Sequence, residues 1–345
     1  MTDLNNKRII IIGGAGFVGS NLAHLLIRTN CEAVWVIDNL LSSEIENIPD
    51  DKRIRFTEGS ISDDEVLSQI TDDYDFIFHL ATFHGNQNSI FDPMADHENN
   101  LLTTLKLFNH IKDFKRLSKV VYSSAGCAAA EKTFDDPTAT TEDTSISINQ
   151  DSPYSISKLV GEFYAVYFHK QNKLPVIRAR FQNVYGPREI LGAGKWRGTP
   201  ATIWRNVTPV FIYKALKSEP LPLENEGVAT RDFIYVDDVC KGLIACALKG
   251  DPGDVYNIAS GIETSIFNLA KMINELTNNP SGIISMPKRK WDNSGKRFGS
   301  PLKAEKQLGF TAEKIIEEGL NITVKWTIDH IKFIEKCIEK HTGHL

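Results

Sequence analysis

Short apolar runs alternate with longer helical patterns over residues 8–180, and this alternation is the feature that most constrains the fold. The runs contain few polar residues, which is typical of strands covered by helices on both faces. They are Arg8–Ile12, Ala33–Ile37, Arg53–Thr57, Asp75–Leu80, Lys119–Ser123 and Pro175–Arg180. Between them lie amphipathic patterns such as Phe17–Arg28. The alternation predicts an α/β fold with a doubly wound parallel sheet.

The first apolar run leads directly into a glycine-rich turn. Ile9–Ile12 is followed by the sequence GGAGFVG at 13–19, which opens the first predicted helix. Its glycines permit a tight turn, a close approach of a pyrophosphate to backbone N–H groups, and close packing of helix on sheet. Such a pattern alone can be a structural turn, but here a strand precedes it and a helix follows. The sequence therefore predicts a dinucleotide-binding site of Rossmann type.

Asp38 ends the second predicted strand, 19 residues after Gly19. At that place a carboxylate accepts hydrogen bonds from an adenosine ribose and repels a 2′-phosphate, so NAD is favoured over NADP. The alternative is that Asp38 only closes a loop.

A tyrosine and a lysine, Tyr154 and Lys158, stand four residues apart on one face of a predicted helix. Ser124 lies thirty residues before Tyr154, at the end of the fifth predicted strand. A free tyrosine has a pKa near 10, and a nearby ammonium and a positive nicotinamide ring both favour the phenolate. We expect Tyr154 to take a proton from a sugar hydroxyl, Ser124 to hydrogen-bond that oxygen, and Lys158 also to hold the nicotinamide ribose.

The rhythm of strands and helices changes after Phe181. We expect a glycine-rich loop at 192–200, a helix at 206–217 and a short extended segment at 221–223. A strand with its following helix is expected at 231–248, and one long amphipathic helix at 311–341. We interpret 1–181 as the NAD-binding Rossmann domain and 182–345 as a smaller α/β domain for the sugar nucleotide. Residues 233–260 are a candidate for crossing back onto the large sheet.

Composition excludes several classes of function. The net charge of −5 leaves no basic field for nucleic acid or an acidic membrane surface. Five scattered cysteines without metal-ligand spacing predict neither a disulfide framework nor a metal site. The apolar residues before Gly13 are too few for a signal peptide or a membrane span. The scattered cysteines predict a reduced, cytoplasmic protein.

The motifs together resemble the NAD-dependent epimerase/dehydratase family, the extended short-chain dehydrogenases that act on nucleotide sugars. The resemblance covers nearly the whole chain and includes HLA at 79–81, RFQNVYGP at 180–187, NVTP at 206–209 and RDFIYVDD at 231–238. It implies a cofactor site of Gly13, Gly16, Phe17, Val18, Gly19, Asp38, Asn39, Ser60, Ile61, Leu80, Ala81, Asn100, Tyr154 and Lys158. It implies substrate contacts from Asn183, Asn206, Val207, Leu223, Arg231 and Arg289, with both arginines on the diphosphate. Ser60 replaces the aspartate that often contacts adenine in the family.

Which reaction follows depends on the residues after Ser124. Dehydratases of the family place an Asp-Glu pair there and decarboxylases a glutamate nearby, whereas this chain has Ala125-Gly126. Epimerisation through a transient 4-keto sugar therefore remains, at C4 by rotation of the ketone or at C5 (or C3) through an enediolate. The rivals are a dehydratase, a 4-ketoreductase, which Asp38 disfavours, and a non-catalytic NAD-binding relative.

The enediolate route needs an acid and a base on opposite faces of the ring. The neighbourhood is similar to that of GDP-mannose 3,5-epimerase, which makes Cys127 a candidate proton carrier and Lys195 or Arg197 a candidate substrate contact. Packing without chemistry is the alternative for Cys127. His84 and Asn86 are candidates for lining the sugar pocket, although a loop histidine need have no such role.

The segments 79–89 and 191–200 closely resemble a bacterial O-antigen subgroup of the family. The subgroup implies a UDP-linked 2,3-diacetamido uronic acid or amide as substrate. The family also implies a homodimer formed by a four-helix bundle of the helices that carry Asn100 and Tyr154.

Overall fold

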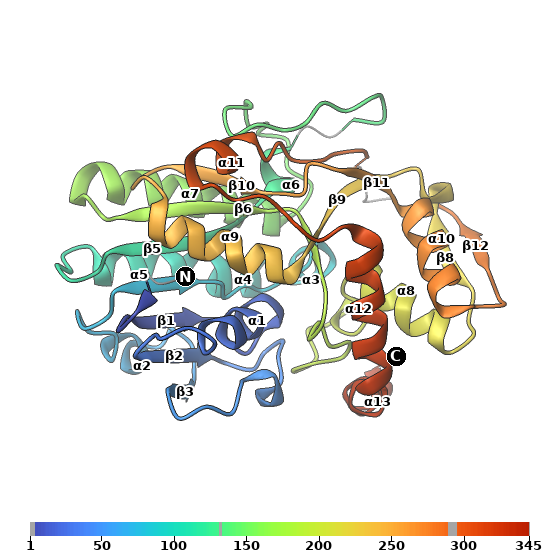
Figure 1. Cartoon of the computed structure of the whole chain (residues 1–345), viewed down its shortest axis with the longest axis horizontal. Coiled ribbons are helices and arrows are strands. Elements are labelled where there is room, and N and C mark those ends of the chain that lie inside the picture. The colour runs from blue at the N-terminus through green and yellow to red at the C-terminus, as the bar shows by residue number, and fades with distance from the viewer. Residues whose placement is uncertain (1–3, 131–132, 289–294, 345) are drawn as a thin grey trace.

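A seven-stranded parallel sheet dominates the computed structural model, which describes residues 4–130, 133–288 and 295–344 (Figure 1). Its strand order, from one edge to the other, is β10 (Val255–Ile258), β6 (Val176–Phe181), β5 (Lys119–Ala125), β4 (Phe76–His79), β1 (Arg8–Ile12), β2 (Ala33–Asp38) and β3 (Ile54–Glu58). The six strands expected from the first half of the sequence all lie in this sheet, and the predicted doubly wound α/β fold is confirmed.

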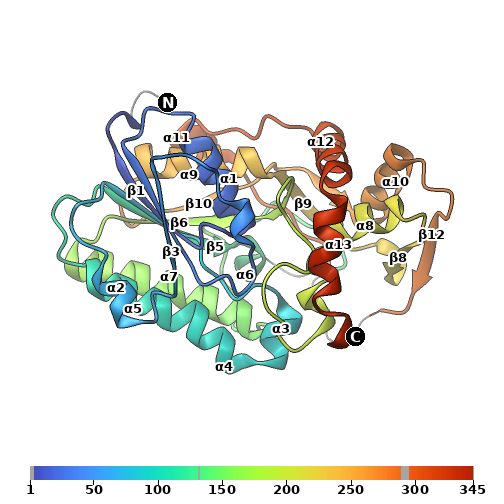
Figure 2. The same ribbon diagram turned by 90° about the horizontal axis from the view of Figure 1, so that it is seen from below.

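Helices cover both faces of this sheet (Figure 2). One face carries α1 (Phe17–Leu26), α9 (Val236–Lys249) and α11 (Leu302–Leu308). The other carries α2 (Asp64–Ser68), α5 (Thr103–Ile111) and α7 (Pro153–Asn172). Strand β1 shows why: Ile9 and Ile11 pack on the first face, Ile10 and Ile12 on the second.

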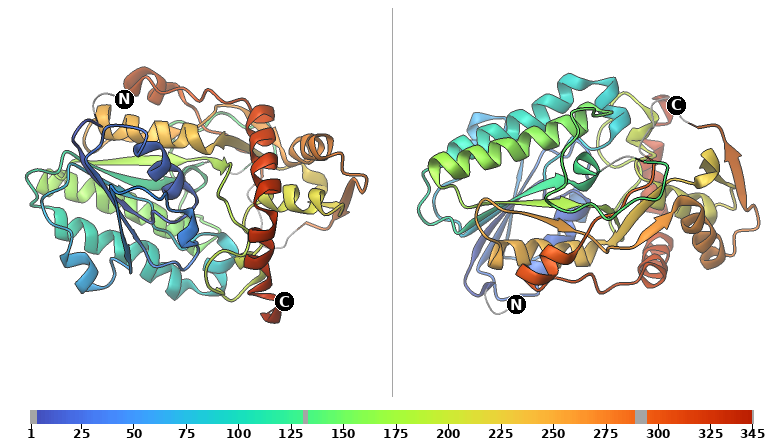
Figure 3. Two further views of the ribbon diagram at one scale, coloured as in Figure 1. Left: turned by 60° about the horizontal axis from the view of Figure 1, so that its bottom comes forward. Right: turned by 90° about the horizontal axis from the view of Figure 1, so that it is seen from above.

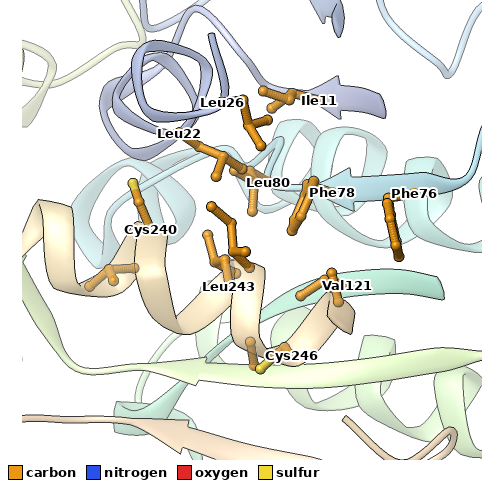
Figure 4. Packing of buried hydrophobic residues seen from close by; sticks show 14 of the residues in the cluster. Ile11, Leu22, Leu26, Phe76, Phe78, Leu80, Val121, Cys240, Leu243 and Cys246 are labelled. Atoms are coloured by element: carbon orange, nitrogen blue, oxygen red, sulfur yellow. The ribbon is translucent and has the colours of Figure 1, made fainter. Parts of the chain in front are cut away.

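Figure 4 shows the first of these cores from close by. Leu22 and Leu26 of α1 and Leu243 of α9 meet Phe78 and other residues of the sheet. Helix α9 and strand β10 come from residues 236–258, in the second half of the chain. Both contribute buried side chains to this core on the first face of the large sheet.

The remaining elements build a smaller layer beside the carboxyl ends of the large sheet. A three-stranded sheet consists of β7 (Asn183–Tyr185), β9 (Thr230–Tyr235) and β11 (Glu263–Ser265). A parallel pair consists of β8 (Leu221–Glu224) and β12 (Ile283–Met286), and helices α8 (Val207–Leu216) and α10 (Ile266–Thr277) pack beside it. Three short helices, α3 (Asn86–Phe91), α4 (Pro93–Asp96) and α6 (Gly126–Ala129), belong to the connections.

The prediction of one long C-terminal helix at 311–341 is wrong in one respect, because the structure contains two helices there. Helix α12 (Ile316–Asp329) ends and α13 (Ile331–Glu339) begins at His330, whose backbone is not helical. The two helices bury their apolar faces in different clusters, α12 with the α8 and α10 layer and α13 with residues 190–203. A single straight helix could not serve both, and the two form a column beside the smaller layer in Figure 3 (left).

None of the helices in the described ranges combines the length and the apolar character that crossing a bilayer requires.

Candidate active site

A cavity of about 550 Å³ lies at the carboxyl ends of the large sheet, between it and the smaller layer. This is the edge at which doubly wound sheets bind ligands. The predicted cofactor residues that line it are Gly13, Gly16, Phe17, Val18, Gly19, Asp38, Asn39, Ser60, Ile61, Leu80, Ala81, Tyr154 and Lys158. The predicted substrate residues that line it are His84, Asn86, Ser124, Asn183, Asn206, Val207 and Arg231.

The glycine-rich turn forms one wall and has no room for side chains. A Cβ on Gly13, whose φ is +84°, would lie 2.5 Å from the backbone nitrogen of Ala81. A Cβ on Gly19 would lie 2.2 Å from the carbonyl oxygen of Gly13. Helix α1 begins after Gly16 without a side-chain cap, so its first N–H groups remain for a ligand. The turn therefore fits a pyrophosphate.

Asp38 both lines the cavity and braces its loops. Its carboxylate accepts hydrogen bonds from the backbone N–H groups of Ala15 and Leu40 and from the Ser43 hydroxyl, each at 2.9 Å. Burial raises its pKa, and these hydrogen bonds oppose that rise. The two interpretations of Asp38 are thus compatible, because the residue that ties the glycine turn to the next loop also faces the cavity.

Ser124, Tyr154 and Lys158 come together at this cavity from β5 and the first turns of α7. The N-terminal turn of α7 is set by Ser152, whose side chain accepts from the backbone of Ser155, and by Pro153 at the first helical position. The Lys158 ammonium donates to the carbonyl oxygen of Ser123 at 3.0 Å. The side chain of Tyr154 stands edge-on to His84, with ring centroids 5.9 Å apart.

His84 meets the cavity as a neutral ring. Burial, followed by the charge of Arg197, lowers its pKa to about 3. At neutral pH one ring nitrogen of His84 can donate a hydrogen bond and the other can accept one, and the ring carries no charge. Its position therefore supports a binding role and not that of a cationic acid.

A buried ion-pair network lies behind Ser124 and was missed in the sequence. The Ser124 hydroxyl donates to Glu162 at 2.6 Å, and Glu162 also binds Arg180 and Arg178. A signal was present, since two arginines interrupt the buried strand β6 and Glu162 stands one helical turn after Lys158. A charge inside an apolar strand implies a buried partner.

Asn100 does not line the cavity, contrary to the prediction of a cofactor contact. Its side-chain oxygen accepts from the backbone N–H of Phe83 at 2.6 Å, and its amide donates to Asp96 at 2.7 Å. Asn100 thus shapes the Thr82–His84 loop, whose Thr82 and His84 are lining residues. A direct cofactor contact is therefore not supported by the lining of the cavity, and Asn100 acts on the loop that forms part of its wall.

Leu223 is likewise a core residue and not a lining one. Its side chain packs in the α8 and α10 cluster, while its neighbours Pro222 and Glu224 line the cavity. On the next strand Arg231 lines it, and Arg297, which was not predicted, does so as well. The alternation of a β-strand explains the outcome, because successive side chains face opposite sides.

The glycine-rich loop of 192–200 is placed differently from the prediction. Lys195 is exposed and does not line the cavity; its backbone N–H donates to Leu41. Arg197 is buried behind the cavity wall, where its guanidinium donates to the carbonyl oxygen of His84 at 3.2 Å. Arg197 therefore supports the loop that carries His84, and neither residue has the position of a direct substrate contact.

Glu189 is a further lining residue that no sequence signal indicated. It follows β7 and accepts a hydrogen bond from Asn206, while its second oxygen has no hydrogen-bond partner among the described residues. Burial raises its pKa from 4.5 to about 7, although Asn206 and Arg205 oppose the rise.

Glu189 should make stability depend on pH. Between pH 4.5 and 7 the folded protein binds more protons at Glu189 than the unfolded chain does. The stabilisation that Glu189 contributes to the folded state is therefore present at low pH and is lost as pH rises through 7. We expect the free energy of unfolding to fall by about 2–3 kcal/mol from this group between about pH 5 and pH 8. Urea unfolding of the wild type and of Glu189→Gln at several pH values measures it. Equal pH slopes in the two proteins would contradict the assignment.

Two predicted residues cannot be placed. Arg289 and the side chain of Cys127 lie outside the described parts of the structure. The four cysteine side chains that are described, Cys31, Cys240, Cys246 and Cys337, are buried free thiols.

Known proteins are similar to this chain along most of their length. A family model described as NAD dependent epimerase/dehydratase family matches residues 9–259. The Bordetella bronchiseptica enzyme WbmF, solved in complex with NAD+ and UDP, is 59% identical over 100% of this chain and 99% of its own, with a TM-score of 0.90. The UDP-glucose 4-epimerase of Thermotoga maritima, solved with UDP-glucose, is 30% identical over 94% of this chain and 99% of its own, with a TM-score of 0.84. A putative UDP-glucose 4-epimerase of Methanocaldococcus jannaschii is 29% identical over 92% of this chain and 97% of its own length.

Proposed function

Because this chain belongs to the NAD dependent epimerase/dehydratase family, as its motifs predicted, we propose that it is a cytoplasmic epimerase of a UDP-linked sugar. The observation that carries the proposal is the convergence of Ser124, Tyr154 and Lys158 on one cavity with the glycine turn. That cavity also contains Arg231 and Arg297, and guanidinium groups suit the diphosphate of a nucleotide sugar.

The residues present fit NAD. Gly13 and Gly19 leave the space that a pyrophosphate needs, and Asp38 stands where it can bind an adenosine ribose and exclude a 2′-phosphate. Bound NAD supplies the acceptor and donor of hydride for the reacting carbon.

We assign proton transfer and sugar binding to side chains of the site. Tyr154 takes the proton of the C4 hydroxyl, which allows the 4-keto sugar to form. Lys158 favours the tyrosinate by its charge, as an ammonium close to a phenol does. Asn183 and Asn206 hold the sugar, and Glu189 adds a polar group beside Asn206.

Epimerisation is favoured over dehydration by the residues around Ser124. Elimination of water requires an acid and a base close to C5 and C6, but Ala125 and Gly126 follow Ser124 in this chain. Glu162, which touches Ser124, is held by Arg180 and Arg178 and is not available for proton transfer. A net ketoreductase with NADPH is disfavoured by Asp38.

The substrate that we propose is a UDP-linked 2,3-diacetamido uronic acid, inverted at C4 or C5, for a bacterial surface polysaccharide. WbmF, at 59% identity, supports the uridine nucleotide, since its crystals contain UDP. The subgroup resemblance of residues 79–89 and 191–200 supports the sugar.

Incubation of the purified protein with UDP-sugars in deuterated water tests this proposal. Inversion at C4 without deuterium would establish rotation of the ketone, and deuterium at C5 or C3 would establish the enediolate route. Absence of any stereochemical change in every UDP-sugar offered, the diacetamido uronic acid included, would refute an epimerase.

We also propose a homodimer formed through α7 and the helical segment that carries Asn100. Ile156, Phe163 and Tyr167 are half exposed along one side of α7, as in helices that pack against a partner. Light scattering should give twice the 38.6 kDa of the chain.

A further inference from the structure

Two arginines stand together at the end of the cavity that holds Tyr154. Arg205 lines the cavity directly before Asn206 in the chain, and Arg197 is only 5% exposed behind the cavity wall. The charge of Arg205 lowers the pKa of Arg197, and the charges of both lower the pKa of His84. Because the ring of His84 lies 5.9 Å from that of Tyr154, the two positive charges are close to the catalytic tyrosine.

Arg197 has no anionic partner among the described residues. Its guanidinium makes one hydrogen bond, from Nη1 to the carbonyl oxygen of His84 at 3.2 Å, while Nε and Nη2 are buried without a partner in that part of the chain. Burial, followed by the charge of Arg205, lowers its pKa to about 9, so it is still a cation at pH 7. A buried cation is costly unless an anion lies nearby.

Arg205 is held by the backbone, and no described carboxylate forms an ion pair with it. Its guanidinium donates to the carbonyl oxygens of Thr202 at 3.2 Å, of Ser42 at 2.6 Å and of Ala193. A guanidinium has five N–H groups, so these bonds leave two for a ligand in the cavity that Arg205 lines. Burial lowers its pKa to about 10, and it also remains charged at pH 7.

The acidic groups whose charges reach Arg205 are Glu44 and Glu189, and they do not neutralise the two arginines. Glu44 already binds Lys340 and the backbone N–H of Gly194. Glu189 is ionised in only about half of the molecules at pH 7, because burial raises its pKa to about 7. An excess of positive charge therefore remains at this end of the cavity.

We propose that Arg205, reinforced by the charge of Arg197, binds a carboxylate on the sugar. The diphosphate of the nucleotide is assigned to Arg231 and Arg297 and the pyrophosphate of the cofactor to the glycine turn, so neither supplies this anion. A guanidinium and a carboxylate form strong charge-assisted hydrogen bonds. The preferred sugar is then a uronic acid, ionised at C6, and not its neutral amide or a hexose with a hydroxymethyl group. This inference rests on the proposed UDP-sugar substrate.

UDP-glucuronic acid and UDP-glucose differ only at C6, so together they measure the effect of the carboxylate. With the NAD-bound protein, we expect calorimetry to give a Kd for UDP-glucuronic acid about ten-fold or more below that for UDP-glucose. Arg205→Met should remove this preference by weakening only the acid. Arg197→Met, which removes a charge that acts only through space, should reduce the preference by a few-fold. The affinities for UDP and for NAD should stay within about two-fold of wild type in both variants.

Two further variants separate binding from packing. Arg53→Met is a matched control, since Arg53 also donates to backbone carbonyls, those of Ile27 and Thr29, and does not line the cavity. It should lower the melting temperature and leave the preference for the acid unchanged. Arg205→Lys keeps the charge and loses the planar fork, so it should retain a larger preference than Arg205→Met. If Arg205→Met does not fold, the wild type, Arg205→Lys and Arg197→Met still test the inference.

Equal affinities of the wild-type protein for the two nucleotide sugars would overturn the inference, and so would a full preference in Arg205→Met. Loss of NAD binding in Arg205→Met would also overturn it, because the arginine would then serve the cofactor's pyrophosphate. A protein that prefers the acid but inverts no sugar would refute the proposed epimerase and leave the carboxylate site standing. Inversion of UDP-sugars without that preference would do the reverse.

Discussion

Replacing Tyr154 by phenylalanine is expected to lower kcat by about 10²- to 10⁴-fold, the range typical of a lost general base. The ring and its edge-on contact with His84 remain, so the change removes one hydroxyl from the cavity. Product formation from a UDP-sugar, followed by proton NMR, measures the effect. Binding of UDP, measured by calorimetry, should change little, because the diphosphate contacts proposed for Arg231 and Arg297 are untouched.

Tyr167→Phe is the matched control for that experiment. Tyr167 stands on the same helix, on the side proposed to face the partner and not among the residues that line the cavity, and the change removes only its hydroxyl. We expect wild-type activity in this control. Full activity in Tyr154→Phe would place the base elsewhere, whereas no product from either the wild type or the variant would make the protein a binder of NAD without this chemistry.

Arg180→Leu should be the most destabilising of the changes considered, at about 3–5 kcal/mol, the cost of leaving a buried charge without its partner. Among the described residues Glu162 would retain the Ser124 hydroxyl and one cation, Arg178 at 3.4 Å, while it stays inside the protein. The bond from Arg180 to the carbonyl oxygen of Glu142 would also be lost. Urea unfolding followed by circular dichroism measures the difference.

An exposed ion pair supplies the comparison for Arg180. Lys314 lies 3.0 Å from Glu318, one turn along the chain, and the two side chains are 33% and 58% exposed. Lys314→Ala should cost less than about 0.5 kcal/mol. Similar losses in the two variants would show that the Glu162 network contributes no more than a surface pair does.

The elements that sequence analysis predicted best are those with local signals. Strand β1 has the predicted bounds because five residues of regular pattern end at a glycine turn. Tyr154 and Lys158 lie on one helix, α7, as predicted, and Ser152 and Pro153 start that helix locally. The same locality makes Tyr154 and Lys158 neighbours, since four residues in a helix are one turn.

Predictions that needed distant contacts were less successful. The break at His330 depends on two clusters that come from different parts of the chain. Lys195 and Arg197 are two residues apart in one loop, yet one is exposed and the other buried, and only the fold decides which. Asn100 belongs to a correct motif, but its partners Phe83 and Asp96 show that its contact with the cavity is indirect.

The sequence by itself thus determined the order of strands and helices, the glycine turn, and the Tyr154–Lys158 pair, because each follows from residues within a few positions of one another. Only the tertiary structure decided that Glu189 meets Asn206 at the cavity and that Glu162 accepts a hydrogen bond from Ser124. Those side chains are 17 and 38 residues apart, and no local pattern states which groups will meet. The meeting is set by how the helices and the smaller layer pack on the sheet, where a buried charge is stable only beside a partner.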